Sequence, residues 1–194
     1  MFEVSIISIR PARKTDAITA AALIQQASVG ISSILTGSEH EPKILAILAR
    51  FFQAEDNRLS YRNALVADEE QHVVGIIVTY YGRDAVNLDR PIIEHLQHLV
   101  HNASVSLDKE ADDDEFYIDT LSVSPDYAGR GIGTALLRAA EQRAQQLQHK
   151  KIALNVDEEN ERAYNLYKRL GYQTEKIVYL YGHPYQHMLK RLFL

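Results

Sequence analysis

The chain has 194 residues and no cysteine, and its formal net charge of −5 comes from 26 acidic and 21 basic residues. The lack of cysteine excludes disulfides, thiolate metal sites and a cysteine acyl-enzyme, and the acidic balance lacks the footprint of a nucleic-acid-binding protein. With 46% hydrophobic and 24% charged residues, the composition predicts one globular domain over residues 1–194, and the acidic balance favours a cationic or amine partner.

The start of the chain carries no recognisable targeting segment. It lacks the charged start, long apolar core and small-residue cleavage site of a signal peptide, and no apolar run reaches membrane-spanning length. We therefore expect a cytoplasmic protein without a membrane partner.

The first half of the chain predicts a strand, two helices and a hairpin. Arg10 and Pro11 end the first apolar run, and Asp16 is placed to cap an alanine-rich helix. The predicted elements are a strand over residues 4–9, helices over 16–29 and 41–52, and a hairpin of residues 64–67 and 73–81.

The second half predicts alternating strands and helices. Its elements are a helix over 91–100, a solvated acidic loop over 108–115, strands over 116–123 and 152–156, a helix over 160–170, and an antiparallel pair of 177–181 and 185–192. Between the first two strands, apolar residues recur at helical spacing at Ile132, Leu136, Ala140, Ala144 and Leu147. This βαβ pattern predicts a parallel strand pair within a mixed α/β fold.

A glycine loop joins the strand over 116–123 to the next helix. Residues 123–137 read VSPDYAGRGIGTALL, with Gly129, Gly131 and Gly133 at alternate positions. Glycines let backbone amides approach an anion, and the helix start points its unpaired N–H groups there, so the loop predicts a phosphate-bearing ligand. The spacing fits neither a dinucleotide fingerprint nor a Walker loop, which leaves a pyrophosphate site without a metal requirement; the alternative is a plain strand-to-helix connection.

This loop and the elements around it resemble the GNAT superfamily of N-acetyltransferases. The loop is similar to the family's acetyl-CoA motif, Arg/Gln-x-x-Gly-x-Gly/Ala, and residues 155–172, NVDEENERAYNLYKRLGY, resemble its companion motif. The resemblance implies a central, mostly antiparallel sheet of six to seven strands, a splayed parallel pair at the cofactor site, and helices on both faces. Ala128 departs from the motif, because the family usually has Arg or Gln there, and Arg130 is the candidate to supply the charge.

The resemblance also implies acetyl-CoA as cosubstrate, no metal, and direct attack by an amine in a ternary complex. It implies that the Val123 N–H polarises the thioester carbonyl and that Tyr167 protonates the departing thiolate. Homodimerisation is a further family expectation, although no pattern identifies an interface. The residues expected to bind the cofactor are Leu121, Ser122, Val123, Ala128, Gly129, Arg130, Gly131, Ile132, Gly133, Thr134, Asn155, Asn160, Ala163 and Tyr167.

The strand over 116–123 changes phase along its length. Phe116 and Ile118 place apolar groups at even positions, whereas Leu121 and Val123 place them at odd positions. This change predicts one extra residue near Thr120, which is a β-bulge. The alternative is a strand buried on both faces.

Two residues of the helix over 160–170 point in the same direction. At about 100° per residue, Asn160 and Tyr167 lie within roughly 20° of each other at the border of the apolar stripe. This arrangement suits a phenol that faces a bound thioester. The alternative is a helix-capping asparagine and a tyrosine at the edge of the core.

Direct attack requires a neutral amine. Deprotonating a lysine-like amine at pH 7 costs about 4.6 kcal/mol, so a base or a desolvating pocket should assist. Asp119 is the candidate base, with Glu115 behind it, and the alternative for either is a solvated or salt-bridged carboxylate. His95, His98 and His101 recur at steps that turn the third ring away from the first, so we expect no metal site there.

The sequence therefore predicts an acetyl-CoA-dependent N-acetyltransferase that acts on the primary amine of a small molecule. Two alternatives stay open: a protein or peptide N-acetyltransferase, and a non-catalytic acyl-CoA-binding sensor.

Overall fold

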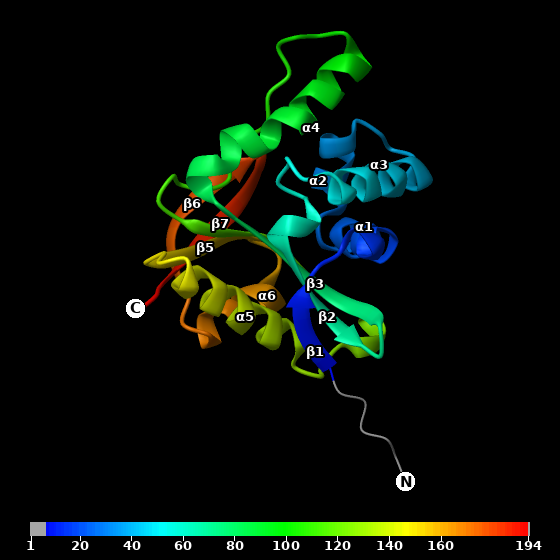
Figure 1. Cartoon of the computed structure of the whole chain (residues 1–194). Helices are drawn as coiled ribbons and strands as arrows, with labels where there is room; N and C mark the ends of the chain where they lie inside the picture. The colour runs from blue at the N-terminus through cyan, green and yellow to red at the C-terminus, as the bar shows by residue number, and fades with distance from the viewer. Residues whose placement is uncertain (1–6, 194) are drawn as a thin grey trace.

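The computed structural model describes residues 7–193, which form a seven-stranded sheet with helices on both faces (Figure 1). The strands lie in the order β1-β2-β3-β4-β5-β7-β6, and β4 with β5 is the parallel pair among antiparallel neighbours. The predicted mixed α/β class and the mostly antiparallel sheet with one parallel pair are thus confirmed.

The strands are β1 (Ile7–Pro11), β2 (Ala64–Glu69), β3 (His72–Tyr81), β4 (Phe116–Val123), β5 (Lys151–Asp157), β6 (Gln173–Leu180) and β7 (His183–Arg191). The α-helices are α1 (Ala17–Ala27), α2 (Val29–Thr36), α3 (Glu41–Gln53), α4 (Ala85–Val100), α5 (Ile132–Gln146) and α6 (Glu161–Arg169). Short 3₁₀ helices lie at Lys14–Asp16, Tyr61–Asn63, Gly82–Asp84 and Pro125–Tyr127.

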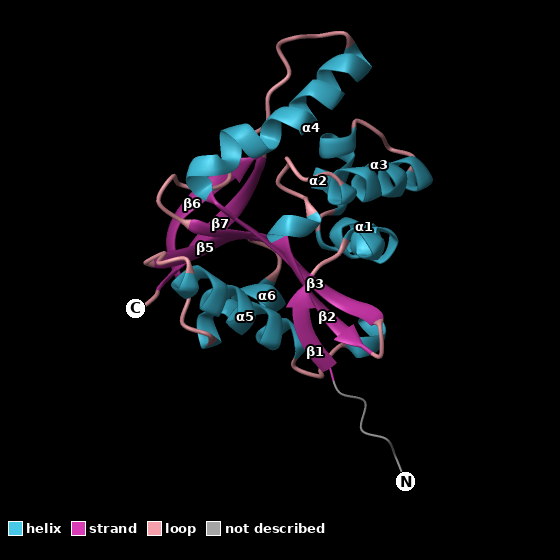
Figure 2. Ribbon diagram, in the orientation of Figure 1, coloured by secondary structure: helices cyan, strands magenta, loops and turns pink. Residues whose placement is uncertain are grey.

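Helices cover both faces of the sheet (Figure 2). A hydrophobic core lies between the sheet and the helices on each face. Ile76 and Val78 of β3 pack with α1 and α3, whereas Ile77 packs with α5, as alternation along a strand requires. The helix groups therefore enclose the sheet from both sides and leave its edges and strand ends for binding.

The parallel pairing of β4 with β5 is short. It joins Phe116–Ile118 to Ile152–Leu154 and then ends, whereas β5 stays paired with β7 along its whole length. The two halves of the sheet consequently diverge beyond Ile118, which creates room between β4 and β5.

A β-bulge in β4 lies at the point of divergence. Val78 pairs with Thr120 and Thr79 pairs with Ile118, so Asp119 is the extra residue. Phe116 and Ile118 before the bulge, and Leu121 and Val123 after it, all pack with the α5 core. The predicted bulge is confirmed, and its phase change keeps both sets of apolar side chains on one face.

The start of the chain differs from the prediction in three ways. Residues 4–6 of the predicted strand lie outside the described residues, and β1 continues through Pro11, which an edge strand tolerates at its end. The first helix ends at Ala27, and a separate helix α2 follows Ser28, whose φ of −145° is not helical. Asp16 does not cap α1, because its carboxylate accepts a hydrogen bond from the Arg13 N–H and pairs with Arg10.

Three further predictions are corrected. The sequence predicts a helix start at Pro91, but α4 begins at Ala85 and carries Pro91 inside it, because its buried positions continue back to Ala85 at helical spacing. The acidic segment before β4 is a loop, as predicted, but it is solvated only in part, since Glu110 and Glu115 are buried there. Leu147 follows the end of α5 and is 55% exposed, so it does not belong to the apolar stripe.

Candidate active site

A cleft of about 1070 Å³ opens where β4 and β5 diverge. The glycine loop and the start of α5 line one part of it, and β4, β5, α6 and the junction of α1 with α2 line the rest. The predicted site residues that line it are Asp119, Leu121, Ser122, Val123, Ala128, Gly129, Gly131, Ile132, Gly133, Thr134, Asn155, Asn160, Ala163 and Tyr167. Arg130 is the predicted residue that does not.

The glycine loop depends on backbone conformation rather than on tight packing. Gly129 and Gly131 have φ of +79° and +77°, and a Cβ on either would meet nothing within 4 Å. Positive φ favours glycine, so both residues are required for the turn. Gly133 lacks this φ, and a Cβ there would make an ordinary contact with Val123.

The amides of this loop are unpaired. Within the described residues, no acceptor is bonded to the backbone N–H groups of residues 129 to 134, and the first helical bond of α5 runs from Ala135 to Gly131. These donors and the start of α5 face the cleft together, which is the arrangement of a helix-terminus anion site.

Positive side chains of α6 also line the cleft. Arg162 and Arg169 line the cleft, and neither has a carboxylate partner within residues 7–193. Arg130 instead stacks over the Tyr127 ring at 4.7 Å, with its Nη1 3.6 Å from Glu69 Oε1. The sequence analysis singled out Arg130 and missed the two arginines of α6.

Two backbone N–H groups of β4 face the gap left by β5. Ser124 donates to Val74, so the alternation of an antiparallel ladder turns the N–H groups of Val123 and Leu121 away from β3. β5 pairs with neither residue. The Val123 carbonyl on the same side accepts a hydrogen bond from Gln26 Nε2 at 2.9 Å.

Tyr167 lies beside this gap in a desolvated position. Its side chain is nearly buried, at 9% exposed, and burial raises its pKa to about 12. Its hydroxyl has no hydrogen-bond partner within the described residues, and its ring packs edge-on against Tyr172. The phenol therefore stays protonated over the whole range in which the protein would work.

Both predicted asparagines have structural partners. Asn160 caps α6, because its Oδ1 accepts from the Ala163 N–H at 3.1 Å. Asn155 Nδ2 donates to the Glu110 carbonyl and to Tyr117 Oη, each at 2.9 Å. Both asparagines still line the cleft.

The candidate bases are paired as well. Asp119 Oδ2 forms an ion pair with Arg58 Nε at 2.8 Å, without the alignment of a hydrogen bond, and its Oδ1 accepts from Thr120. Glu115 is fully buried, with its Oε1 3.1 Å from His187 Nε2. Each is thus a salt-bridged carboxylate, one of the alternatives that the sequence left open.

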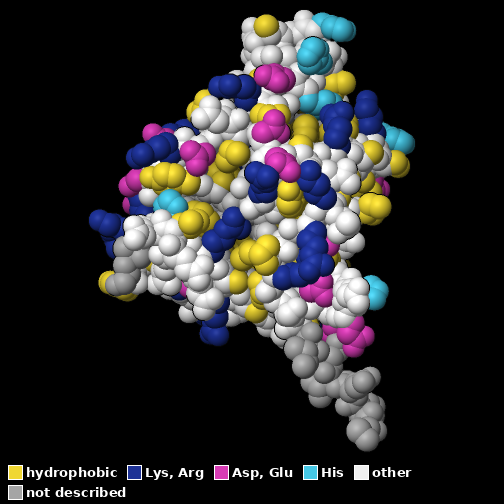
Figure 3. Space-filling view, viewed as in Figure 1, with side chains coloured by type: hydrophobic (Ala, Val, Ile, Leu, Met, Phe, Trp, Pro, Cys, Tyr) yellow, Lys and Arg dark blue, Asp and Glu magenta, His cyan; other side chains and the backbone are white. Residues whose placement is uncertain are grey.

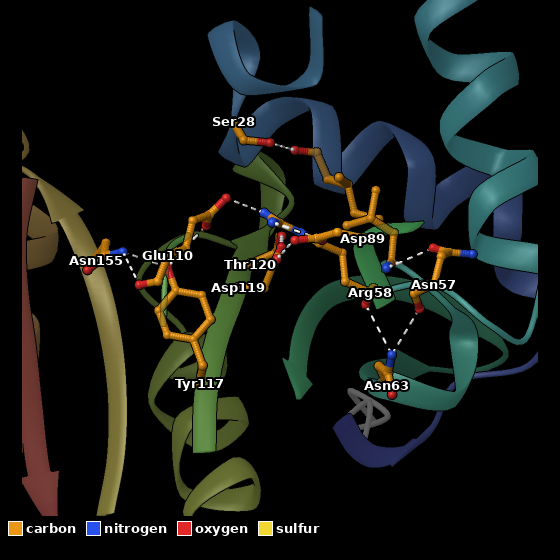
Figure 4. A network of polar contacts seen from close by, with 12 residues as sticks. Ser28, Asn57, Arg58, Asn63, Asp89, Glu110, Tyr117, Asp119, Thr120 and Asn155 are labelled. Atoms are coloured by element: carbon orange, nitrogen blue, oxygen red, sulfur yellow. Dashed lines mark hydrogen bonds and ion pairs between the residues drawn. The ribbon is translucent and has the colours of Figure 1, made fainter. Parts of the chain in front are cut away.

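A buried charge cluster, which we call the Arg58 cluster, was not predicted. It consists of Arg58, Asp89, Glu110 and Asp119, and Figure 4 shows Glu110 between Tyr117 on one side and Arg58 on the other. Arg58 and Glu110 are 52 residues apart in sequence. No spacing pattern marks such a pair, and Glu110 belongs to an acidic run that is typical of a solvated loop.

Another group of acidic residues lies beside β5 and β7. Asp112, Glu115, Glu175 and His187 bring potential ligand atoms within 4.8 Å of one another. Lys176 pairs with Asp112 at 2.7 Å and Lys151 lies 3.7 Å from Glu115, so two of these carboxylates already have cationic partners. Histidine side chains gather toward the upper end of the molecule in Figure 3. His95 of α4 contacts Arg50 and the Thr36 carbonyl.

None of the helices within residues 7–193 is both long and apolar enough to cross a membrane.

Comparisons with known proteins agree with this geometry. Residues 34–172 match the sequence model of the acetyltransferase (GNAT) family. A 61-residue segment is 41% identical to an uncharacterised N-acetyltransferase from Methanocaldococcus jannaschii. The matched segment is 31% of this chain and 27% of that relative. The fold is similar to an N-acetyltransferase structure from Staphylococcus aureus Mu50, with a TM-score of 0.80, 28% identity and coverage of 94% and 100% of the two chains. It is also similar to another acetyltransferase structure, with a TM-score of 0.78, 29% identity and coverage of 96% and 100%.

Proposed function

The chain belongs to the GNAT family of acetyltransferases, and we propose that it transfers the acetyl group of acetyl-CoA to the primary amine of a small molecule. The observation that carries the proposal is the cleft between β4 and β5, which is lined by the unpaired amides of the glycine loop, by two arginines of α6, and by the carboxylates of Glu110, Asp119 and Asp157. This combination of groups suits an anionic cosubstrate and a cationic acceptor in one site.

The phosphate groups of the cosubstrate would bind at the glycine loop. The amides of Gly129, Arg130, Gly131, Gly133 and Thr134 are the donors for the pyrophosphate, and Arg162 and Arg169 supply charge in place of the missing Arg or Gln at position 128. Several unpaired N–H donors together offer an anion more hydrogen bonds than one exposed side chain would.

The edge of β4 would hold the reacting end. The N–H groups of Leu121 and Val123 face the gap, so either can donate to the thioester carbonyl as negative charge develops on its oxygen. Gln26 must release the Val123 carbonyl if that group binds the cosubstrate as well.

Tyr167 would donate a hydrogen bond to the departing sulfur. Complete proton transfer from a phenol with a pKa of about 12 to a thiolate of ordinary basicity is uphill by about 5 kcal/mol. Stabilisation by the hydrogen bond is therefore the larger part of its role. The amine would attack the acetyl group directly, and the absence of cysteine excludes a thioester intermediate with the enzyme.

Two measurements test this function. Calorimetry with coenzyme A should give a binding signal, and thiol release from acetyl-CoA should depend on an added small amine. Binding without release across an amine panel would indicate a sensor, and release with peptides alone would indicate a peptide acetyltransferase. No heat with coenzyme A would overturn the proposal altogether.

A further inference from the structure

The Arg58 cluster carries more negative than positive charge. The Arg58 guanidinium is 2% exposed and forms ion pairs with Asp89 at 3.5 Å, with Asp119 at 2.8 Å and with Glu110. Within the described residues, one cation thus faces three carboxylates. Buried charge without a partner is costly, so the cluster favours a further cation or retains a proton.

Two phenols lie beside the cluster. Within the described residues, Tyr181 Oη is buried without a hydrogen-bond partner, and the ring of Tyr80, which is 4% exposed, lies 5.9 Å from the Arg58 guanidinium. Burial raises the pKa of both phenols, and the negative charge of Glu110 raises it further. Tyr181 follows Leu180, which lines the cleft, and a polar ligand atom bound beside it would satisfy this buried hydroxyl.

A directional chain of hydrogen bonds orients Glu110. Its backbone carbonyl can only accept, so the Asn155 amide must point Nδ2 toward it and toward Tyr117 Oη. Tyr117 in turn donates its proton to Glu110 Oε2 at 3.2 Å. The Asn155 Oδ1 then faces His187 Nδ1 at 2.7 Å, which places a proton on that ring nitrogen.

We propose that Glu110 binds the ammonium group of the acceptor and accepts its proton, with Tyr181 Oη as a second hydrogen-bond acceptor for the same nitrogen. This inference rests on the proposed function and names the base that the reaction needs. Glu110 lines the cleft, next to the bulge at which the reacting end of the cosubstrate would lie. Tyr117 and Asn155 are positioning residues, because they act through Glu110.

The step balances as follows. The ammonium gives one proton to Glu110, and the neutral nitrogen forms a bond to the acetyl carbon as the carbon–sulfur bond breaks. The second nitrogen proton passes to the thiolate, and Glu110 releases its proton to solvent. The products are the amide, the coenzyme A thiol and one proton.

Burial supports this role for Glu110. Desolvation, together with Asp119 and Asp89, raises its pKa above the ordinary range of glutamate, toward the pH at which a base works best. The groups that face it from the surrounding elements are Arg58, Tyr80, Asp89, Tyr117, Asp119, Tyr181 and Tyr185.

The experiment compares Glu110→Gln with wild type on ethylamine and on 2,2,2-trifluoroethylamine, which is already neutral at pH 7. Removing a general base should lower kcat/KM for ethylamine at least about a hundredfold. The loss with the fluorinated amine should be less than about tenfold, because that amine needs no base. Glu141→Gln, the same substitution in a Lys190 ion pair on α5, is the control for a lost carboxylate.

The outcomes separate the two proposals. Equal losses with both amines, or an unchanged acid limb of the pH profile in Glu110→Gln, would overturn the role of Glu110 while acetyl transfer by the wild type stands. Asp89→Asn removes a carboxylate from the cluster that does not line the cleft. Glu110→Gln should abolish the acid limb of the pH profile. If Asp89→Asn abolished it as well, the limb would report the titration of the whole cluster, and Glu110 would not be the base. Failure of the wild type to acetylate any amine would overturn the proposed function and this inference together.

Discussion

Arg58 Nε lies 2.8 Å from Asp119 Oδ2, at the residue where β4 bulges. A buried ion pair thus joins the loop after α3 to the strand that borders the cleft. The same guanidinium neutralises part of the charge of Glu110 and Asp89, so its contribution to stability and its effect on the site are linked.

Replacing Arg58 by methionine should therefore destabilise the protein strongly. Removing one partner of a buried pair typically costs about 3–5 kcal/mol of unfolding free energy, because the remaining charges are left without compensation. Urea unfolding at pH 7 would measure it. Arg143→Met, which removes an arginine that has no carboxylate partner in the described structure, should cost less.

The loss of unfolding free energy caused by Arg58→Met should be smaller at pH 5 than at pH 7. The pKa values of Asp89 and Glu110 are already raised in the folded protein, and loss of the cation raises them further. A raised carboxyl pKa contributes stability below its unfolded value and loses it as the pH rises through the folded value. An equal loss at both pH values would show that these carboxylates are not the source.

Tyr167→Phe should lower kcat by about tenfold to a hundredfold, the worth of one hydrogen bond to a charged group. Affinity for coenzyme A should change little, because the phenyl ring keeps its packing. Since the pKa of Tyr167 is raised to about 12, its titration should not limit the wild-type rate below about pH 10. Steady-state kinetics and calorimetry on the same preparation would check this, and unchanged turnover would remove the proposed role of the hydroxyl.

Gly131→Ala should weaken binding of coenzyme A. The left-handed conformation costs a non-glycine residue about 1–2 kcal/mol, so the loop would shift its amides or lose stability. Gly182→Ala introduces the same strain, at φ of +84°, in the turn after β6. It should lose similar stability without losing coenzyme A affinity, as melting curves and calorimetry can show; equal affinities for both variants would argue against the loop as the phosphate site.

Acceptors that carry a carboxylate should be poor substrates. Butylamine and 4-aminobutanoate share one carbon chain, but the second brings a negative charge to a cleft lined by Glu110 and Asp119. We expect kcat/KM for 4-aminobutanoate to be lower by at least about tenfold, the effect of about 1.4 kcal/mol of repulsion. Thiol release with the two amines would measure it, and a preference for the amino acid would contradict the charge argument.

Features encoded over short distances were predictable from the sequence. The bulge followed from the phase change across Thr120, and the βαβ unit followed from the stripe on α5, because both patterns arise between neighbouring residues. The helix predicted over 160–170 ends beside Gly171, whose φ of +92° suits a glycine after a helix.

Features that depend on distant residues were not predictable. Arg58 and Glu110 are brought together by the tertiary fold, and a glutamate in an acidic run carries no sign that it will be buried. At Pro91 the sequence predicts a helix start where there is none. The burial of Ala85 and Asp89 holds the preceding turns of α4 in place despite the proline. In both cases tertiary packing overrides the local signal.

Three residue pairs are the whole of the backbone pairing between β4 and β5. A sheet joined by so few pairs can bend at this junction, because each half keeps its own hydrogen bonds when the two halves move. A molecule bound between β4 and β5 would connect the two halves of the sheet. Its binding would reduce their relative motion, so the rigidity of the sheet would depend on the bound molecule as well as on the chain.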